Sequence, residues 1–478
     1  MVRQEIKKTI KKAVRKYKVS GFLVETQKEK NHGDYSTNVA MIIAKKEKRN
    51  PQEVANLLIK KMEDKRWKIE IAGPGFINFF LSDEYLKKVK VSTKLNIGKR
   101  KKINVEFISA NPTGPLTLGN GRGGFGGDVL SNVLKKAGYD VTREFYINDR
   151  GNQIKRLKEG DYKGETRTAS QIQKENQKVI TKKMKINFDV WFSEKSLTKE
   201  IAKSLTLLKK KGLTYEKDNA LWFKSTSFGD DKDRVLVKKN GETTYFASDI
   251  AYLKNKFDRG FSKLIIFLGA DHYGYIGRMK AAVEALGYDK KQIDFVVMQF
   301  VALMESGKVK KMSKRAGVYR TVKELIDDLG LDIVRFFFIQ RGANSHLIFD
   351  LELAKEKSQK NPVYYIQYAY ARMSSILRKA KIKPAKKLSL LKEEDMDLMK
   401  QVIRFPEIVE DTAKDYQMQR IPQYAIELAE SFHRFYQYCP VISDDKKITA
   451  SRLALVKTTQ EILKETLNLM GISAPEKM

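Results

Sequence analysis

Residues 101–138 limit the possible folds of this chain more than any other stretch. They begin with the apolar run KKINVEFIS, pass through the glycine-rich ANPTGPLTLGNGRGGFGG, and end in DVLSNVLKKAG, where apolar residues recur at helical spacing before a closing glycine. A strand, a glycine turn and a helix in this order are typical of the first unit of a parallel α/β sheet. The later apolar runs REFYI, KLIIFLG and DFVVMQF alternate with helical segments, which predicts that the sheet continues.

Regions with other patterns flank this α/β region. Residues 1–98 combine a basic amphipathic helix with the turn and strand EIAGPGFINFFLS, which predicts a small α+β domain. Residues 99–356 form the predicted α/β domain, a Rossmann-type parallel sheet. Within it, a lysine-rich stretch near 155–217 does not follow the alternation of strands and helices and is interpreted as an insertion. From 357 to 478 the pattern is almost wholly helical, which predicts a C-terminal all-α domain.

Composition narrows the classes of partner. Lys and Arg number 93 against 58 Asp and Glu, a formal charge of +35, so a polyanion such as RNA is the expected partner, although solvated lysine-rich faces would give the same balance. The single Cys439 excludes an internal disulfide, and four histidines without a cysteine pair argue against a zinc site. The start of the chain lacks an apolar signal segment and no run of about 18 apolar residues occurs, which predicts a cytoplasmic protein.

Two segments of the α/β domain carry phosphate-binding chemistry. PLTLGNGRGG follows the first strand, where a helix amino end favours an anionic ligand, but no lysine completes a P-loop. GKVKKMSKRAG places several cations in a loop bounded by glycines, which could close over a polyphosphate. Each segment also has a purely structural interpretation: the glycine-rich segment could be a tightly packed strand–helix corner, and the basic loop could be a solvated surface turn. Their joint occurrence indicates an ATP site.

The chain resembles the arginyl-tRNA synthetases, a family of class I aminoacyl-tRNA synthetases, nearly from end to end. The segments that carry the resemblance are NHGDYSTNVA, AGPGFINF, VEFISANPTGPLTLGNGRG, REFYINDRGNQI, ALWFKSTSFGDDKDRVLVKKNGETTYFASDIAYL, LGADHYGYIGRMKAA, KMSKRAG, NPVYYIQYAYARMSSILRKA and GISAPEKM. The resemblance implies that arginine and ATP give arginyl-adenylate, with Mg²⁺ carried by the nucleotide and no zinc. The arginyl group then passes to the terminal ribose of tRNA(Arg). A monomer is expected, with a shortened segment after Gln153.

The resemblance also implies the roles of individual residues, several of which have structural alternatives. Glu106 could instead be an edge-strand surface charge, Asp249 a helix-terminal charge, and His272 a core histidine. The aromatic stripe after Pro362 could be core, and so could the strand that holds Phe76. The implied roles are arginine binding by Glu106, Asn111, Tyr245 and Asp249; catalysis by Thr117, Asn120, Lys311 and Lys314; ATP binding by Gly119, Gly121, Asp271, His272, Met312 and Ser313; and tRNA binding by Phe76, Asn78, Tyr365, Tyr368, Arg372 and Met478.

One motif departs from the family pattern. Thr117-Leu118-Gly119-Asn120 stands where most class I enzymes have His-x-Gly-His, so both histidines that would donate to the α-phosphate are missing. A catalytically inactive paralogue that binds tRNA or another RNA is therefore the alternative hypothesis. Against it, the Thr hydroxyl and the Asn amide can both donate hydrogen bonds, the motif resembles the variant of the tryptophanyl-tRNA synthetases, and the other motifs stand unaltered.

Overall fold

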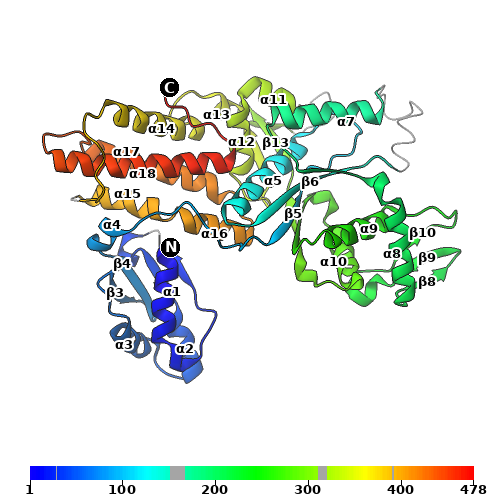
Figure 1. The fold of residues 1–478 in the computed structure, drawn as a ribbon, viewed down its shortest axis with the longest axis horizontal. Coiled ribbons are helices and arrows are strands. Elements are labelled where there is room, and N and C mark those ends of the chain that lie inside the picture. The colour runs from blue at the N-terminus through cyan, green and yellow to red at the C-terminus, as the bar shows by residue number, and fades with distance from the viewer. Residues whose placement is uncertain (28, 151–166, 311–319, 390–391) are drawn as a thin grey trace.

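The computed structural model describes the 478-residue chain except residues 28, 151–166, 311–319 and 390–391. Figure 1 shows an amino-terminal unit below, an α/β unit to the right and a bundle of long helices to the upper left. This is the predicted fold class, a parallel-sheet domain between an α+β unit and an all-α unit. Among the described residues, no helix is long and apolar enough to cross a lipid bilayer.

The amino-terminal unit is an antiparallel sheet packed against helices. The strands lie in the order β1-β2-β4-β3, and apolar side chains from the helices and from β4 form its core. Helix α3 begins with Asn50 as its cap and proline as its first residue, a common start for a helix. The elements are α1 (Val2–Ala13), β1 (Val24–Thr26), β2 (Tyr35–Thr37), α2 (Val39–Glu47), α3 (Pro51–Met62), β3 (Trp67–Ala72), β4 (Phe76–Leu81) and α4 (Asp83–Lys88).

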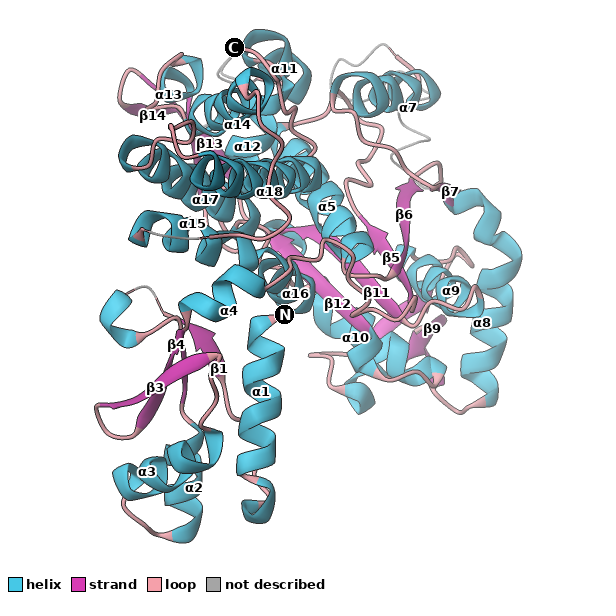
Figure 2. Cartoon of the chain, turned by 60° about the vertical axis from the view of Figure 1, so that its left-hand side comes forward, coloured by secondary structure: helices cyan, strands magenta, loops and turns pink. Residues whose placement is uncertain are grey.

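The central sheet has five parallel strands in the order β12-β11-β5-β6-β7, and Figure 2 shows β12, β11, β5 and β6. The strand order reverses beside β5, and ligands of open α/β sheets bind at the carboxyl ends of strands next to such a reversal. This sheet and the main helices beside it comprise β5 (Lys102–Glu106), α5 (Leu118–Lys136), β6 (Asp140–Ile147), β7 (Val190–Ser193), α9 (Tyr245–Asp258), β11 (Lys263–Gly269), α10 (Tyr275–Leu286) and β12 (Ile293–Met298).

Helix α5 begins earlier than the sequence pattern suggests. The glycines of LGNGRGGFGG were expected in a turn, with the helix starting at Asp128, but the helix starts at Leu118 and contains them. The reason is packing: a Cβ on Gly127 would lie 2.2 Å from the ring of Phe107, and one on Gly121 would lie 2.6 Å from Val322. Each helical glycine costs about 1 kcal/mol relative to alanine, so close approach to neighbouring elements decides the residue type here.

The stretch interpreted as an insertion is partly built into the sheet. Residues 155–166 lie outside the described part, but β7 pairs with β6 over four residues and extends the parallel sheet. The remaining elements of this unit form two small three-stranded sheets and their helices. They are α7 (Ala169–Lys178), α8 (Thr198–Lys210), β8 (Thr214–Lys217), β9 (Ala220–Phe223), β10 (Arg234–Val237), β13 (Val301–Glu305), β14 (Lys308–Lys310), α11 (Val322–Leu329), α12 (Leu331–Ile339), β15 (Leu347–Asp350) and α13 (Leu351–Lys355).

The helical unit is held to the amino-terminal unit by buried charges. The backbone N–H of Arg3 donates to Glu407 Oε1 at 2.7 Å, and its guanidinium pairs with Asp411. Tyr35 donates to the other oxygen of Glu407 at 3.1 Å, so the carboxylate is fully used although burial raises its pKa. The helices are α14 (Pro362–Lys379), α15 (Glu393–Ile403), α16 (Phe405–Asp415), α17 (Arg420–Tyr438) and α18 (Lys446–Met470).

Candidate active site

Glu106 is the last residue of β5 and is buried, so it is not a surface charge on an edge strand. Its Oε1 accepts a hydrogen bond from Ser109 Oγ at 3.1 Å, and its Oε2 lies 2.5 Å from Lys256 Nζ. The sequence pattern around Glu106 does not predict this lysine partner. The carboxylate lies at the carboxyl edge of the central strand, beside the reversal of strand order.

The chain after Glu106 is strained. Ile108 and Ser109 have φ of 65° and 36°, a region that β-branched residues rarely adopt, and such strain concentrates at functional sites. Ser109 Oγ accepts from the backbone N–H of Tyr146 at 3.0 Å, which ties this loop to β6. The loop leads to Asn111, one of the predicted arginine ligands, which is exposed.

Asp249 and Tyr245 were predicted to share a face if their segment is helical. The segment is helix α9, and the two residues lie one turn apart on it. Tyr245, the first residue of the helix, is 53% exposed, whereas Asp249 is half-buried. Burial raises the pKa of Asp249 to about 7, with further contributions from Glu194 and Glu106, while Arg278 opposes the shift. Asp249 is therefore not a helix-terminal surface charge.

Glu194 is a carboxylate that the sequence analysis missed. It directly follows β7, is 2% exposed, and its Oε2 has no hydrogen-bond partner among the described residues. Burial raises its pKa. The signal was present in VWFSEK, an apolar strand followed by an acid as in INVEF, but the stretch was assigned to an insertion. Three carboxylates, from Glu106, Glu194 and Asp249, thus come from different elements and interact electrostatically.

Thr117 and Asn120 form a capping box at the start of α5. Thr117 Oγ1 accepts from the backbone N–H of Asn120 at 3.2 Å, and Asn120 Oδ1 accepts from the backbone N–H and the hydroxyl of Thr117 at 3.0 and 2.9 Å. Both side chains were predicted to donate to a ligand. In this arrangement the Thr117 hydroxyl donates to Asn120 instead, so it does not donate to a ligand. The Nδ2 of Asn120 has no partner in the described part of the chain and can donate to a ligand.

The other predicted ATP residues have different surroundings. Gly119 is exposed at the start of α5, whereas Gly121 is buried under Val322, so Gly121 serves packing and is not an open approach to a phosphate. Asp271 and His272 follow β11 and are exposed, which excludes the core alternative for His272. Lys311, Met312, Ser313 and Lys314 lie outside the described residues. Thr321, just beyond them, forms a bridge with Thr117.

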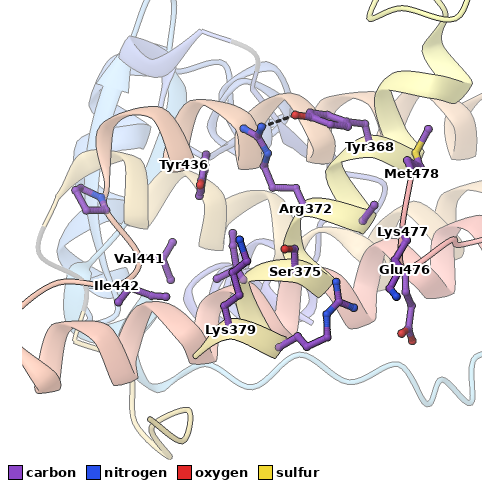
Figure 3. A pocket seen from close by; sticks show the side chains of 14 residues that line it. Tyr368, Arg372, Ser375, Lys379, Tyr436, Val441, Ile442, Glu476, Lys477 and Met478 are labelled. Carbon is purple, nitrogen blue, oxygen red and sulfur yellow. Dashed lines mark hydrogen bonds between the residues drawn. The ribbon is translucent and has the colours of Figure 1, made fainter. Parts of the chain in front are cut away.

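A groove of about 770 Å³ lies in the helical unit (Figure 3). Tyr368 and Arg372 of α14 line it together with Met478, and α17 adds Tyr436, which the sequence analysis did not single out. The guanidinium of Arg372 lies 4.8 Å from the ring centre of Tyr368 and 4.9 Å from that of Tyr436. Tyr365 was expected in the same stripe but packs on His433, with ring centres 4.7 Å apart, and does not line the groove.

A second depression, of about 720 Å³, lies in the amino-terminal unit. Phe76, at the start of β4, is 39% exposed and lines it. Asn78 was predicted to contact RNA but is only 3% exposed, in the middle of β4, which pairs with β2 and β3. Buried in this way, Asn78 cannot contact tRNA directly as predicted, whereas Phe76 is exposed and can.

Comparisons with known proteins account for all three units. Family models match residues 1–81 (arginyl tRNA synthetase N terminal domain), residues 82–190 and 153–335 (tRNA synthetases class I (R), catalytic domain) and residues 366–478 (DALR anticodon binding domain). The "Arginine--tRNA ligase 1" of Halalkalibacterium halodurans is 45% identical over 95% of this chain and 94% of its own length. This chain belongs to the arginyl-tRNA synthetases, the class I arginine–tRNA ligases.

Other relatives agree with this assignment. The "Arginine--tRNA ligase" of Bacillus subtilis is 42% identical over 100% of this chain and 98% of its own length. That alignment spans 547 positions, more than the 478 residues of this synthetase, so this chain is the shorter at one or more places. The arginyl-tRNA synthetase of Thermus thermophilus has the same fold, with a TM-score of 0.83 at 21% identity over both full chains. Full-length similarity to named ligases does not favour the inactive RNA-binding paralogue.

Proposed function

We propose that this synthetase activates L-arginine in the pocket formed by Glu106, Glu194 and Asp249, with Asn111 and Tyr245 at its rim. A guanidinium is permanently charged and offers a planar fork of donors, so a partly buried group of carboxylates is the matching receptor. The observation that carries the proposal is the placement of three carboxylates: Glu106 ends β5, Glu194 directly follows β7 and both are buried, and Asp249 on α9 interacts electrostatically with them. Carboxylates gathered in a buried site call for a cation, in agreement with the raised pKa of Asp249.

The chemistry is positioning and charge neutralisation. A carboxylate oxygen of arginine attacks the α-phosphorus of ATP, and the bond to pyrophosphate breaks. A hydroxyl of the terminal tRNA ribose then attacks the adenylate carbonyl, and AMP leaves. Asn120 donates to the α-phosphate as charge develops, Gly119, Asp271 and His272 lie beside the nucleotide, and Lys311 and Lys314 with Met312 and Ser313 hold the leaving pyrophosphate. Mg²⁺ enters with ATP, and the enzyme acts as a cytoplasmic monomer.

Charging unfractionated tRNA with each standard amino acid in turn tests this proposal. We expect esterification with arginine alone, and inclusion of ATP and Mg²⁺ should be necessary. A protein that binds tRNA tightly but charges it with no amino acid would contradict the proposal and restore the RNA-binding alternative. Equal charging with lysine would contradict the pocket, because lysine cannot use a planar set of acceptors.

The raised pKa of Asp249 predicts that arginine affinity depends on pH. Asp249 must be ionised to receive the guanidinium, so arginine binding releases a proton wherever the free enzyme holds one, below pH values near 7. Lowering the pH from 7 to 6 should weaken arginine binding about fivefold, since the ionised fraction falls while arginine keeps its charge. Titration calorimetry of the enzyme with arginine measures this, and a dissociation constant that does not change over this range would contradict it.

The groove of the helical unit is proposed to receive an anticodon base of tRNA, as Phe76 is proposed to contact the D-loop. Tyr436→Ala should weaken tRNA binding by about 1 kcal/mol, roughly fivefold, because exposed aromatic rings stack on unpaired bases. The guanidinium of Arg372 already covers part of the ring, which argues for the lower end of the range. Filter binding measures the loss, and Tyr365→Ala is the control: it should lower the melting temperature with less effect on tRNA affinity.

A further inference from the structure

Helix α9 carries a lysine that has no contact with solvent. The Lys256 side chain is 0% exposed, two turns beyond Asp249, and its Nζ lies 2.5 Å from Glu106 Oε2 and 3.8 Å from Glu144 Oε1. It also lies 4.3 Å from the ring centre of Tyr252. A buried ammonium is costly without a partner of opposite charge, so the neighbouring carboxylates account for its presence.

Glu144 has a second cationic partner besides this lysine. Arg259 donates to both of its oxygens, at 2.6 and 2.9 Å, and the Tyr252 hydroxyl and the Asn104 amide donate at 2.5 and 3.1 Å. Lys256 also lowers the pKa of Glu144, so its charge is shared between the two carboxylates, but it lies nearer to Glu106. Lys256, Glu144 and Arg259 are not among the residues implied by the resemblance to the family.

This assignment changes what Glu106 contributes to the proposed arginine pocket. One oxygen of its carboxylate is held by Lys256 and the other accepts from Ser109, whose conformation is strained. Glu106 is therefore fixed in one orientation and paired, whereas Glu194 and Asp249 remain to balance the charge of a guanidinium. A buried ion pair of this kind is weak support for stability, because well-packed apolar residues often do as well.

We infer that Lys256 is a positioning residue for arginine: it acts through Glu106, fixing that carboxylate and the loop to Asn111, and it reduces the negative charge of the pocket. The inference rests on the proposed arginine pocket. Without Lys256, Glu106 would lose its orientation and would be an unpaired carboxylate in a buried site. Arginine should then bind less well, while ATP, which contacts other residues, should not be affected.

The test compares Lys256→Met, Glu106→Gln and the double variant by arginine-dependent ATP–pyrophosphate exchange in the presence of tRNA. Lys256→Met should raise the KM for arginine at least tenfold and change the KM for ATP less than twofold. Because Lys256 acts through Glu106, the double variant should be no worse than the poorer single variant. Lys254→Met, which removes a partly exposed lysine of the same helix paired with Asp258, is the matched control and should leave both KM values unchanged.

Three outcomes would overturn the inference: an unchanged KM for arginine, equal rises for arginine and ATP, or losses that multiply in the double variant. If Lys256→Met does not fold, the double variant provides the test, because it leaves no unpaired charge at Glu106. The KM of the double variant for arginine should match that of Glu106→Gln. A much higher KM overturns the inference. Failure of the proposed pocket is distinguishable, because it would leave Asp249→Asn without effect on arginine in the same assay.

Discussion

Asp249→Asn is expected to weaken arginine binding by roughly 2–5 kcal/mol, since removing one partner of a desolvated charge pair leaves the guanidinium unbalanced. Asparagine keeps the size of the side chain, so the helix and its packing should persist. ATP binding should change little, because the nucleotide is proposed to lie against α5 and the end of β11. Titration calorimetry with each substrate separately measures the two affinities.

Two further measurements test whether Asp249 itself binds the guanidinium. The variant should lose the pH dependence of arginine binding near neutrality, because the titrating carboxyl is gone. Asp258→Asn, at the exposed end of the same helix, is the matched control and should behave as the unmodified enzyme. Equal weakening of arginine and ATP by Asp249→Asn would mean that the variant disturbs the fold, and the pocket assignment would be wrong.

Asn120→Asp should slow adenylate formation roughly ten- to a hundredfold while leaving the helix intact. The new carboxylate can still accept the hydrogen bonds from Thr117 that close the capping box, and a negative charge at a helix start is favourable. It cannot donate to the α-phosphate, and a lost hydrogen bond to a charged group is worth about 1.5–3 kcal/mol. Single-turnover formation of arginyl-adenylate measures the effect.

Thr117 variants separate the cap from the chemistry. Thr117→Val removes the hydroxyl and should cost about 0.5–2 kcal/mol of stability as a lost cap, visible as a lower melting temperature. Thr117→Ser keeps the hydroxyl and should keep the stability of the unmodified enzyme. If Asn120→Asp forms adenylate at the unmodified rate, the amide does not contact the phosphate, and the motif at residues 117–120 serves only to start the helix.

Local patterns in the sequence were enough to predict the class of fold. The strand, glycine-rich segment and helix of residues 101–138 predicted a parallel sheet, and the helical pattern after 357 predicted the all-α unit, because hydrophobic periodicity is a property of neighbouring residues. The motifs also led to the family, which the comparisons confirm. Residues such as Glu106 and Asp249 were found through those motifs, since their immediate surroundings allow a surface charge as well as a buried carboxylate.

Contacts between distant residues were decided only by the tertiary structure. Phe107 and Val322 leave no room for side chains at two glycines of α5, and Asn78 is buried within β4. Glu194 lies at the same edge of the sheet as Glu106 because β7 extends the sheet. The pairing of Lys256 with Glu106 spans 150 residues of sequence. Burial and charge pairing depend on which elements pack together. The pattern of residues along the sequence therefore predicts candidate residues but does not determine which of them lie in the same site.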